Sequence, residues 1–205
     1  MKNHLSYFLP ILLLLTACTS SSSLNSNSSG DITCDNYRAA MRDFVIEISN
    51  TARQTKPSFI VIPQNGQNVA WDDDSAETIT PDKEFFAAID GTGREDVFYG
   101  MNLQFEIADG FRTPANLSQD IQDMCDVYLA AGKAILSIDY TTSNQSKIND
   151  SYQKNDTKNY IPFAATKRKL NEIPSYLPHN CNTNNINKLN EARNFLYLIN
   201  PEKYS

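Results

Sequence analysis

The feature that most constrains the fold is an alternation of short apolar runs with longer stretches of helical periodicity. The runs are rich in β-branched and aromatic residues and too short for helices, so they predict strands buried on both faces at residues 59–62, 88–92, 133–140 and 160–165. Pro162 weakens the last prediction, because proline donates no ladder hydrogen bond. Helices placed between buried strands require a parallel sheet, so the sequence predicts an α/β fold.

Helical spacing of apolar residues fills the intervals between these runs. Asp35 and Ser118 are candidate N-caps, Lys56-Pro57 ends the first helix, and Gly132 follows the last turn of another. The expected helices lie at residues 35–56, just after Pro81, and at 118–131, 146–154 and 186–198.

The N-terminus has the pattern of an export signal. An apolar run at residues 7–15 follows Lys2, and it is much shorter than the roughly 20 residues that span a bilayer. The run leads into Leu-Thr-Ala-Cys, which resembles a bacterial lipobox and makes Cys18 the expected lipid-modified residue; ordinary cleavage near Ala17, with Cys18 left as a free thiol, is the alternative. Thr19, where an aspartate would signal inner-membrane retention, favours the outer membrane.

These observations divide the chain into a signal at residues 1–17, a lipidated cysteine with a flexible tether at 18–32, and a folded domain at 33–205. The tether is predicted from its serine- and asparagine-rich composition, which offers almost no apolar surface for packing. The expected location is the cell envelope, with the chain anchored by lipid at the outer membrane or extracellular face.

Charge, cysteine and histidine content narrow the chemistry. The net charge of -6 argues against a nucleic-acid partner and suits a cationic or neutral substrate. Cys34, Cys125 and Cys181 lack the spacing of a zinc or redox motif; two of them could form a disulfide, and the sequence leaves the pairing open. Beyond the signal the only histidine is His179, expected in an exposed loop, so no metal or cofactor is predicted.

Polar residues follow the predicted strands and suggest a site. In parallel α/β folds, functional groups lie beyond the carboxyl ends of strands. By that rule one rim should carry Gln64, Asn65, Glu95, Asp96, Asp139 and Tyr140, with Arg168 behind the last strand. The run Asp72-Asp73-Asp74 lacks the alternating spacing of a calcium loop and is better explained as a solvated charge run.

Six segments, in chain order, resemble a known family. They are MRDFVIEISNTAR, FIVIPQNG, AIDGTGREDVFYG, AAGKAILSIDY, YIPFAA and EARNFLYLIN. Together they resemble the C-terminal half of the endo-α-1,4-polygalactosaminidase-like glycoside hydrolases, family 114 and its relatives, over most of residues 37–201. IPQNG combined with IDG-x-G-x-ED-x-FYG is the more specific part.

The resemblance implies a parallel (β/α)8 TIM barrel, of which this chain carries the C-terminal half with about four βα units. It implies hydrolysis of an amino-sugar polysaccharide by two carboxylates, with Glu95 as proton donor and an aspartate partner in the family's N-terminal half. The alternative for Glu95 is a surface glutamate paired with Arg94. Asp139 is either a second carboxylate or a structural cap, and Asp90 is expected to bond mainly to backbone.

The remaining candidates are substrate-binding residues: Gln64, Asn65, Asp96, Tyr140 and Arg168. Gln64 and Asn65 have amides suited to sugar hydroxyls, although Asn-Gly is also an ordinary turn dipeptide. Trp71 is expected to be exposed and able to stack on sugar rings, while Tyr99 and Tyr140 could stack or belong to the core. The expected partners are a polysaccharide and the membrane through Cys18. Three alternatives stay open: a non-catalytic glycan-binding lipoprotein, a truncated inactive remnant, and a homodimer of paired half-barrels.

Overall fold

The computed structural model describes residues 34–72 and 80–199, apart from the side chains of residues 34–36. The signal, Cys18, the tether, Asp73 and Asp74 lie outside these ranges. The elements are α1 (Cys34–Thr55), η1 (Gln67–Ala70), α2 (Lys83–Ala88), β1 (Gly91–Glu95), β2 (Tyr99–Met101), β3 (Ile107–Arg112), α3 (Ala115–Ala130), β4 (Ala134–Tyr140), α4 (Gln145–Thr157), β5 (Ile161–Ala165) and η2 (Leu189–Glu191).

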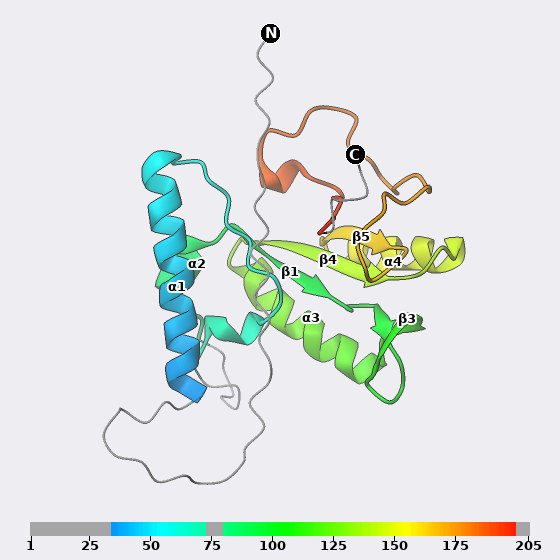
Figure 1. Ribbon diagram of the computed structural model, residues 1–205, viewed down its shortest axis with the longest axis horizontal. Helices are drawn as coiled ribbons and strands as arrows, with labels where there is room; N and C mark the ends of the chain where they lie inside the picture. The colour runs from blue at the N-terminus through cyan, green and yellow to red at the C-terminus, as the bar shows by residue number, and fades with distance from the viewer. Residues whose placement is uncertain (1–33, 73–79, 200–205) are drawn as a thin grey trace.

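The central element is a parallel sheet of order β1-β4-β5, with α1 beside the β1 end and α4 beside β5 (Figure 1). The predicted α/β class with a parallel sheet is therefore confirmed. Within the described ranges the sheet has three strands and does not close into a barrel. A separate antiparallel pair, β2-β3, was not predicted. No helix in the described part of the chain is both long and apolar enough to cross a bilayer.

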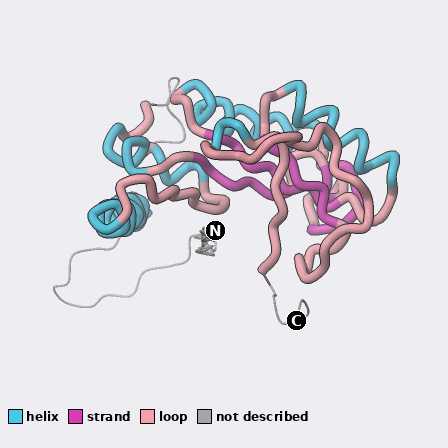
Figure 2. Tube along the Cα trace, turned by 90° about the horizontal axis from the view of Figure 1, so that it is seen from above, coloured by secondary structure: helices cyan, strands magenta, loops and turns pink. Residues whose placement is uncertain are grey.

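The two faces of the sheet are covered differently. Most helices lie on one side of the strands, α1 lies beyond one end of the sheet, and the last part of the C-terminal segment runs on the other side (Figure 2). On the helical side Ile121, Cys125 and Tyr128 of α3 belong to the same buried cluster as Ile135. On the opposite side Phe195, Tyr197 and Ile199 pack against a cluster of Ile138, Tyr140, Phe163, Ala165 and Leu170.

Residues 59–62 do not form the buried strand that was predicted. The segment is extended and runs along β1, with Asp90 N–H donating to Val61 O (2.9 Å) and Gly93 N–H to Pro63 O (2.8 Å). The ladder is incomplete because Pro63 has no N–H and the Val61 N–H donates to the Asp90 side chain instead (2.8 Å). The segment therefore forms an irregular, partly exposed edge.

Other predictions differ in extent. The strand expected at 88–92 begins at Gly91, and α3 begins at Ala115, ahead of the expected cap Ser118. The helix expected at 186–198 is wrong. Apart from the short 3-10 helix η2, the chain there is irregular, and Phe195 N–H donates to Pro162 O (3.3 Å) and Ile199 N–H to Leu170 O (3.1 Å).

Several side chains settle points that the sequence left open. Trp71 is 3% exposed, so its predicted exposure is wrong, whereas His179 is exposed as expected. Cys125 and Cys181 are free thiols, and the Cys34 side chain lies outside the described residues. Burial raises the pKa of Cys125 to about 12, which keeps this thiol protonated and unreactive at neutral pH.

Candidate functional site

The site centres on Glu95, the last residue of β1. Both of its carboxylate oxygens are engaged: Asn65 Nδ2 donates to Oε2 (2.6 Å), and the Tyr140 hydroxyl donates to Oε1. Asn65 also accepts from the Glu95 backbone, with 3.1 Å between Glu95 N and Asn65 Oδ1. Asn65 and Tyr140 therefore fix the orientation of a half-buried carboxylate at the carboxyl end of a parallel strand.

The turn after Pro63 places Asn65 against β1. Asn65 and Gly66 both have left-handed backbone conformations, with φ of 58° and 65°. Asparagine and glycine are the residues that adopt this region most readily, so the Asn-Gly pair reverses the chain at little cost. The turn and the amide contact are thus combined in Asn65.

Gln64 lies over Gly93, on the face of β1 that also carries Glu95. A Cβ added at Gly93 would lie 1.9 Å from Gln64 Oε1, so only glycine allows this approach. Gln64 Nε2 is buried and has no hydrogen-bond partner among the residues that the structure describes. The amide is a candidate donor to a ligand, as the sequence predicted for a sugar hydroxyl.

Tyr140 connects Glu95 to Arg168. The Arg168 guanidinium carbon lies 3.7 Å from the centre of the Tyr140 ring, which is a close cation–π contact. Burial, followed by the negative charge of Glu95, raises the pKa of Tyr140. The phenol consequently stays protonated and remains a donor to Glu95.

Arg168 is held by internal partners. Its Nη2 donates to Asp96 Oδ1 (2.7 Å) and to Gly100 O (3.0 Å), and its Nε donates to Asp109 Oδ1 (2.8 Å). Burial raises the pKa of Asp96, against the opposing effect of Arg168. Asp96 and Arg168 were predicted to bind substrate. The structure places both residues beside the site, where they form an ion pair with each other.

Asp139 is fully enclosed. Its Oδ1 accepts from the backbone N–H groups of Phe98 (2.8 Å) and Tyr99 (3.1 Å), and its Oδ2 accepts from Ser151 Oγ (2.6 Å) and Asn155 Nδ2 (3.1 Å). With 0% of its surface exposed, Asp139 has the contacts of a structural carboxylate. This geometry favours the capping alternative over the catalytic one.

The contacts of Arg94 and Asp90 bear on two alternatives from the sequence, the pairing of Arg94 with Glu95 and a structural role for Asp90. Arg94 does not hold the Glu95 carboxylate: it donates to Gln67 Oε1 (3.1 Å), and burial lowers its pKa. Asp90 accepts from the Val61 backbone (2.8 Å) and from Arg53 (2.9 Å), which is the structural role expected for it. Within the described part of the chain, no group of three or more histidine, cysteine or acidic side chains is arranged to hold a metal.

Sequence reasoning missed Asp109 and the hydroxyl contact of Tyr140. Asp109 lies on β3, part of the unpredicted hairpin, so nothing in the periodicity marked it. Tyr140 was recognised as a strand-end residue, but its partner depends on the register, which pairs Glu95 with Ile138. The register leaves Tyr140 on the face of Glu95 and Asp139 on the face covered by helices.

The fold and the site define an α/β protein with a positioned carboxylate at the carboxyl edge of a parallel sheet. No family model matches the chain. It is 30% identical to an uncharacterized protein of Methanocaldococcus jannaschii over 144 residues, which cover 66% of this chain and 37% of that relative. It is 31% identical to an uncharacterized protein of Thermotoga maritima over 131 residues, which cover 61% of this chain and 36% of that relative. The match thus spans little more than a third of either curated relative.

Proposed function

We propose that this protein is a glycoside hydrolase that acts on an amino-sugar polysaccharide, with Glu95 as the proton donor. The observation that carries the proposal is the fixed orientation of Glu95 by Asn65 and Tyr140 at a strand end. The motifs IPQNG and IDG-x-G-x-ED-x-FYG, which resemble those of the polygalactosaminidase-like hydrolases, contribute Asn65 and Glu95, and the segment AAGKAILSIDY contributes Tyr140. The acidic net charge suits a substrate with ammonium groups.

The proposal includes a finer account of the fold and location. Residues 59–64, β1, β4 and β5 run side by side in one direction, which supports descent from the C-terminal half of a (β/α)8 barrel. The lipobox-like residues at Cys18 support lipid anchoring at the cell envelope.

In the proposed reaction Glu95 donates a proton to the glycosidic oxygen as the bond to the leaving sugar breaks. A second carboxyl group must either attack the anomeric carbon or activate water. Asp139 is enclosed and Asp96 is paired with Arg168, so we place the second group outside the described residues. Asn65 and Tyr140 keep the Glu95 carboxyl group in one orientation, which proton transfer requires.

A non-catalytic glycan-binding role is the second candidate. The engagement of Asp96 and Asp139 inside the protein favours it, because binding requires no second carboxyl group. Gln64, with its unpartnered amide, would serve either role.

The test is release of reducing ends from partially deacetylated galactosamine polymers by the mature chain. Glu95→Gln should lower the rate at least about 100-fold, the usual contribution of a positioned general acid. Glu84→Gln, an exposed glutamate of α2, serves as the control and should leave the rate unchanged. Turnover that survives Glu95→Gln would remove the proposal, and polymer binding without turnover in the wild type would favour the second candidate.

A further inference from the structure

The β2-β3 hairpin carries four exposed large apolar side chains. Leu103, Phe105, Ile107 and Phe111 are 78%, 52%, 68% and 60% exposed, respectively. Single exposed apolar residues are common on proteins, but a group of them in one short hairpin marks an interaction surface. We refer to these four side chains as the hairpin surface.

The tip of the hairpin holds Phe105 in a conformation that aromatic residues avoid. Its φ is 62°, in the left-handed region favoured by glycine and asparagine. Asn102 maintains the turn by accepting from the backbone N–H groups of Gln104 (2.9 Å) and Glu106 (3.0 Å). About half of the Phe105 side chain is exposed, and residues with a strained backbone concentrate at ligand sites.

The base of the hairpin is joined to the Glu95 site. Arg168, which stacks on Tyr140, binds Gly100 O at 3.0 Å and Asp109 Oδ1 at 2.8 Å. Lys147 Nζ donates to Gly110 O at 2.6 Å and provides a second contact to β3. The hairpin surface is therefore carried on a rigid base that is continuous with the contacts around Glu95.

We propose that the hairpin surface binds sugar units of an amino-sugar polysaccharide whose neighbouring units reach Glu95. The apolar faces of pyranose rings pack on aromatic side chains, which Phe105 and Phe111 supply. Exposed Glu106, next to Phe105, and the net charge of -6 complement the ammonium groups of deacetylated units. The inference rests on the proposed function for its substrate class, but it concerns binding and not bond cleavage.

The test measures binding of a partially deacetylated galactosamine polymer by isothermal titration calorimetry, with Glu95→Gln present throughout so that the polymer stays intact. Adding Phe105→Gly should weaken binding at least about tenfold, the loss of one well-packed aromatic contact. The same change should leave the melting temperature unchanged or higher, because glycine adopts the left-handed conformation without strain. Leu177→Ala, at a residue 91% exposed elsewhere, is the control and should leave binding unchanged.

Unchanged affinity in the Phe105→Gly variant would overturn the proposal. A wild-type dimer in sedimentation that Phe105→Gly converts to monomer, with polymer binding unchanged, would also overturn it and assign the surface to protein contact. Phe105-dependent binding by a wild type that shows no turnover supports the hairpin surface and removes only the hydrolase proposal. If turnover depends on Glu95 but binding does not depend on Phe105, the hydrolase proposal is supported and only the hairpin-surface proposal is removed.

Discussion

At the scale of single residues, the contact between Tyr140 and Glu95 is the most informative. Tyr140→Phe removes the hydroxyl donor while keeping the ring on which Arg168 stacks. We expect polysaccharide hydrolysis to fall about 10- to 100-fold, because the Glu95 carboxyl group loses one of its two orienting contacts. Steady-state kinetics should show the loss mainly in kcat.

The matched control for that change is Tyr160→Phe, which removes another buried tyrosine hydroxyl. Tyr160 donates to Asp126 at 2.8 Å, away from Glu95. This variant should lose stability, about 1 kcal/mol for one hydrogen bond, and keep its activity. Equal activities for the two variants would show that Tyr140 has only a structural role.

Asp139 gives a prediction about pH. Burial raises the pKa of Asp139 above 3.8, against the effect of its hydrogen bonds, so the folded protein holds this proton more tightly than the unfolded chain does. The contribution of Asp139 to stability is complete below pH 3.8 and is lost as pH rises through the folded-state pKa. Asp139→Asn removes this dependence, so the stability advantage of the wild type over the variant should shrink as pH rises.

Urea unfolding at several pH values from about 4 to 8 would measure the stability difference between the two proteins. Asp156→Asn, at an exposed carboxyl group of α4, controls for the general effect of removing a charge. A wild-type advantage that grows with pH would contradict the assigned direction.

At the scale of elements, Gly100 determines how the hairpin is anchored. Its φ is 140°, and an added Cβ would lie 1.7 Å from Asp96 Oδ1 and 2.9 Å from Arg168 Nη2. Gly100→Ala should therefore separate Asp96 from Arg168 and destabilise the protein by about 1–3 kcal/mol. Limited proteolysis should show faster cleavage in the hairpin, and denaturant unfolding should give the free-energy loss.

Gly132→Ala is the control for that prediction. Gly132 also has a left-handed conformation, with φ of 74°, but an added Cβ meets no atom within 4 Å. Gly132→Ala should lower the free energy of unfolding by only about 1 kcal/mol, the cost of a left-handed backbone at alanine, and should not speed cleavage in the hairpin. Similar effects of the two substitutions would mean that the contact between Gly100 and Asp96 has little importance.

The elements also show what the sequence could predict. α1, β4, α4 and β5 were predicted from local signals, namely the helical spacing of apolar residues and the short apolar runs. The structure of residues 59–62 and 186–198 could not be predicted from local signals. Val61 N–H donates to the Asp90 side chain and Phe195 N–H donates to Pro162 O, and both partners are distant in the sequence. β2 was missed because Tyr99–Met101 is too short to show an alternating pattern.

The candidate site was predictable to a similar degree. The rule that polar groups gather beyond parallel strands brought out Asn65, Glu95 and Tyr140, which the structure joins by hydrogen bonds. The rule could not separate Glu95 from Asp139, because neighbouring positions on a strand point to opposite faces and only the register decides which face is covered.

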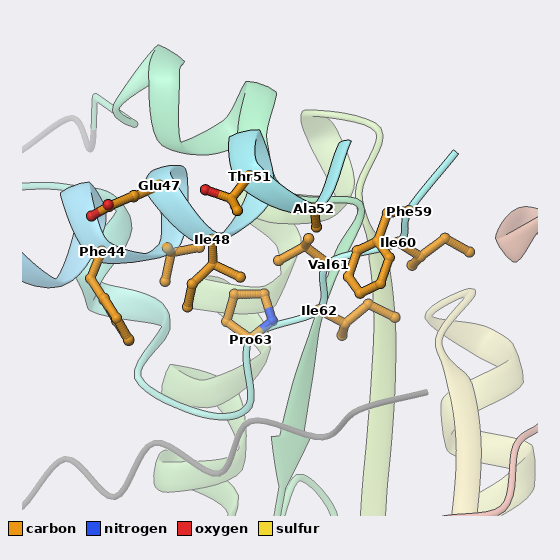
Figure 3. A pocket seen from close by; sticks show the side chains of 11 residues that line it. Phe44, Glu47, Ile48, Thr51, Ala52, Phe59, Ile60, Val61, Ile62 and Pro63 are labelled. Atoms are coloured by element: carbon orange, nitrogen blue, oxygen red, sulfur yellow. The ribbon is translucent and has the colours of Figure 1, made fainter. Parts of the chain in front are cut away.

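At the scale of the whole molecule, the outer edge of residues 59–63 is open. Together with α1 it borders a groove of about 470 Å³, in which Phe44 and Ile48 point toward the same space as Pro63 (Figure 3). Phe44 is 48% exposed and Ile60 is 37% exposed. Because Val61 and Pro63 bond to the β1 side, the backbone groups of Ile60 and Ile62 face outward, without a partner in the described ranges.

An edge of this kind can pair with a copy of itself, so we propose that the homodimer left open by the sequence forms at this edge. We expect the mature chain to associate at micromolar concentrations, and Ile62→Lys to abolish association because it would bury a charge at the edge. Sedimentation equilibrium of both proteins would measure this. Ile173→Lys, at a residue 62% exposed and outside the groove, adds the same charge and should leave association intact. A wild type that stays monomeric, or an equal loss of association in Ile62→Lys and Ile173→Lys, would contradict a homodimer formed through this edge.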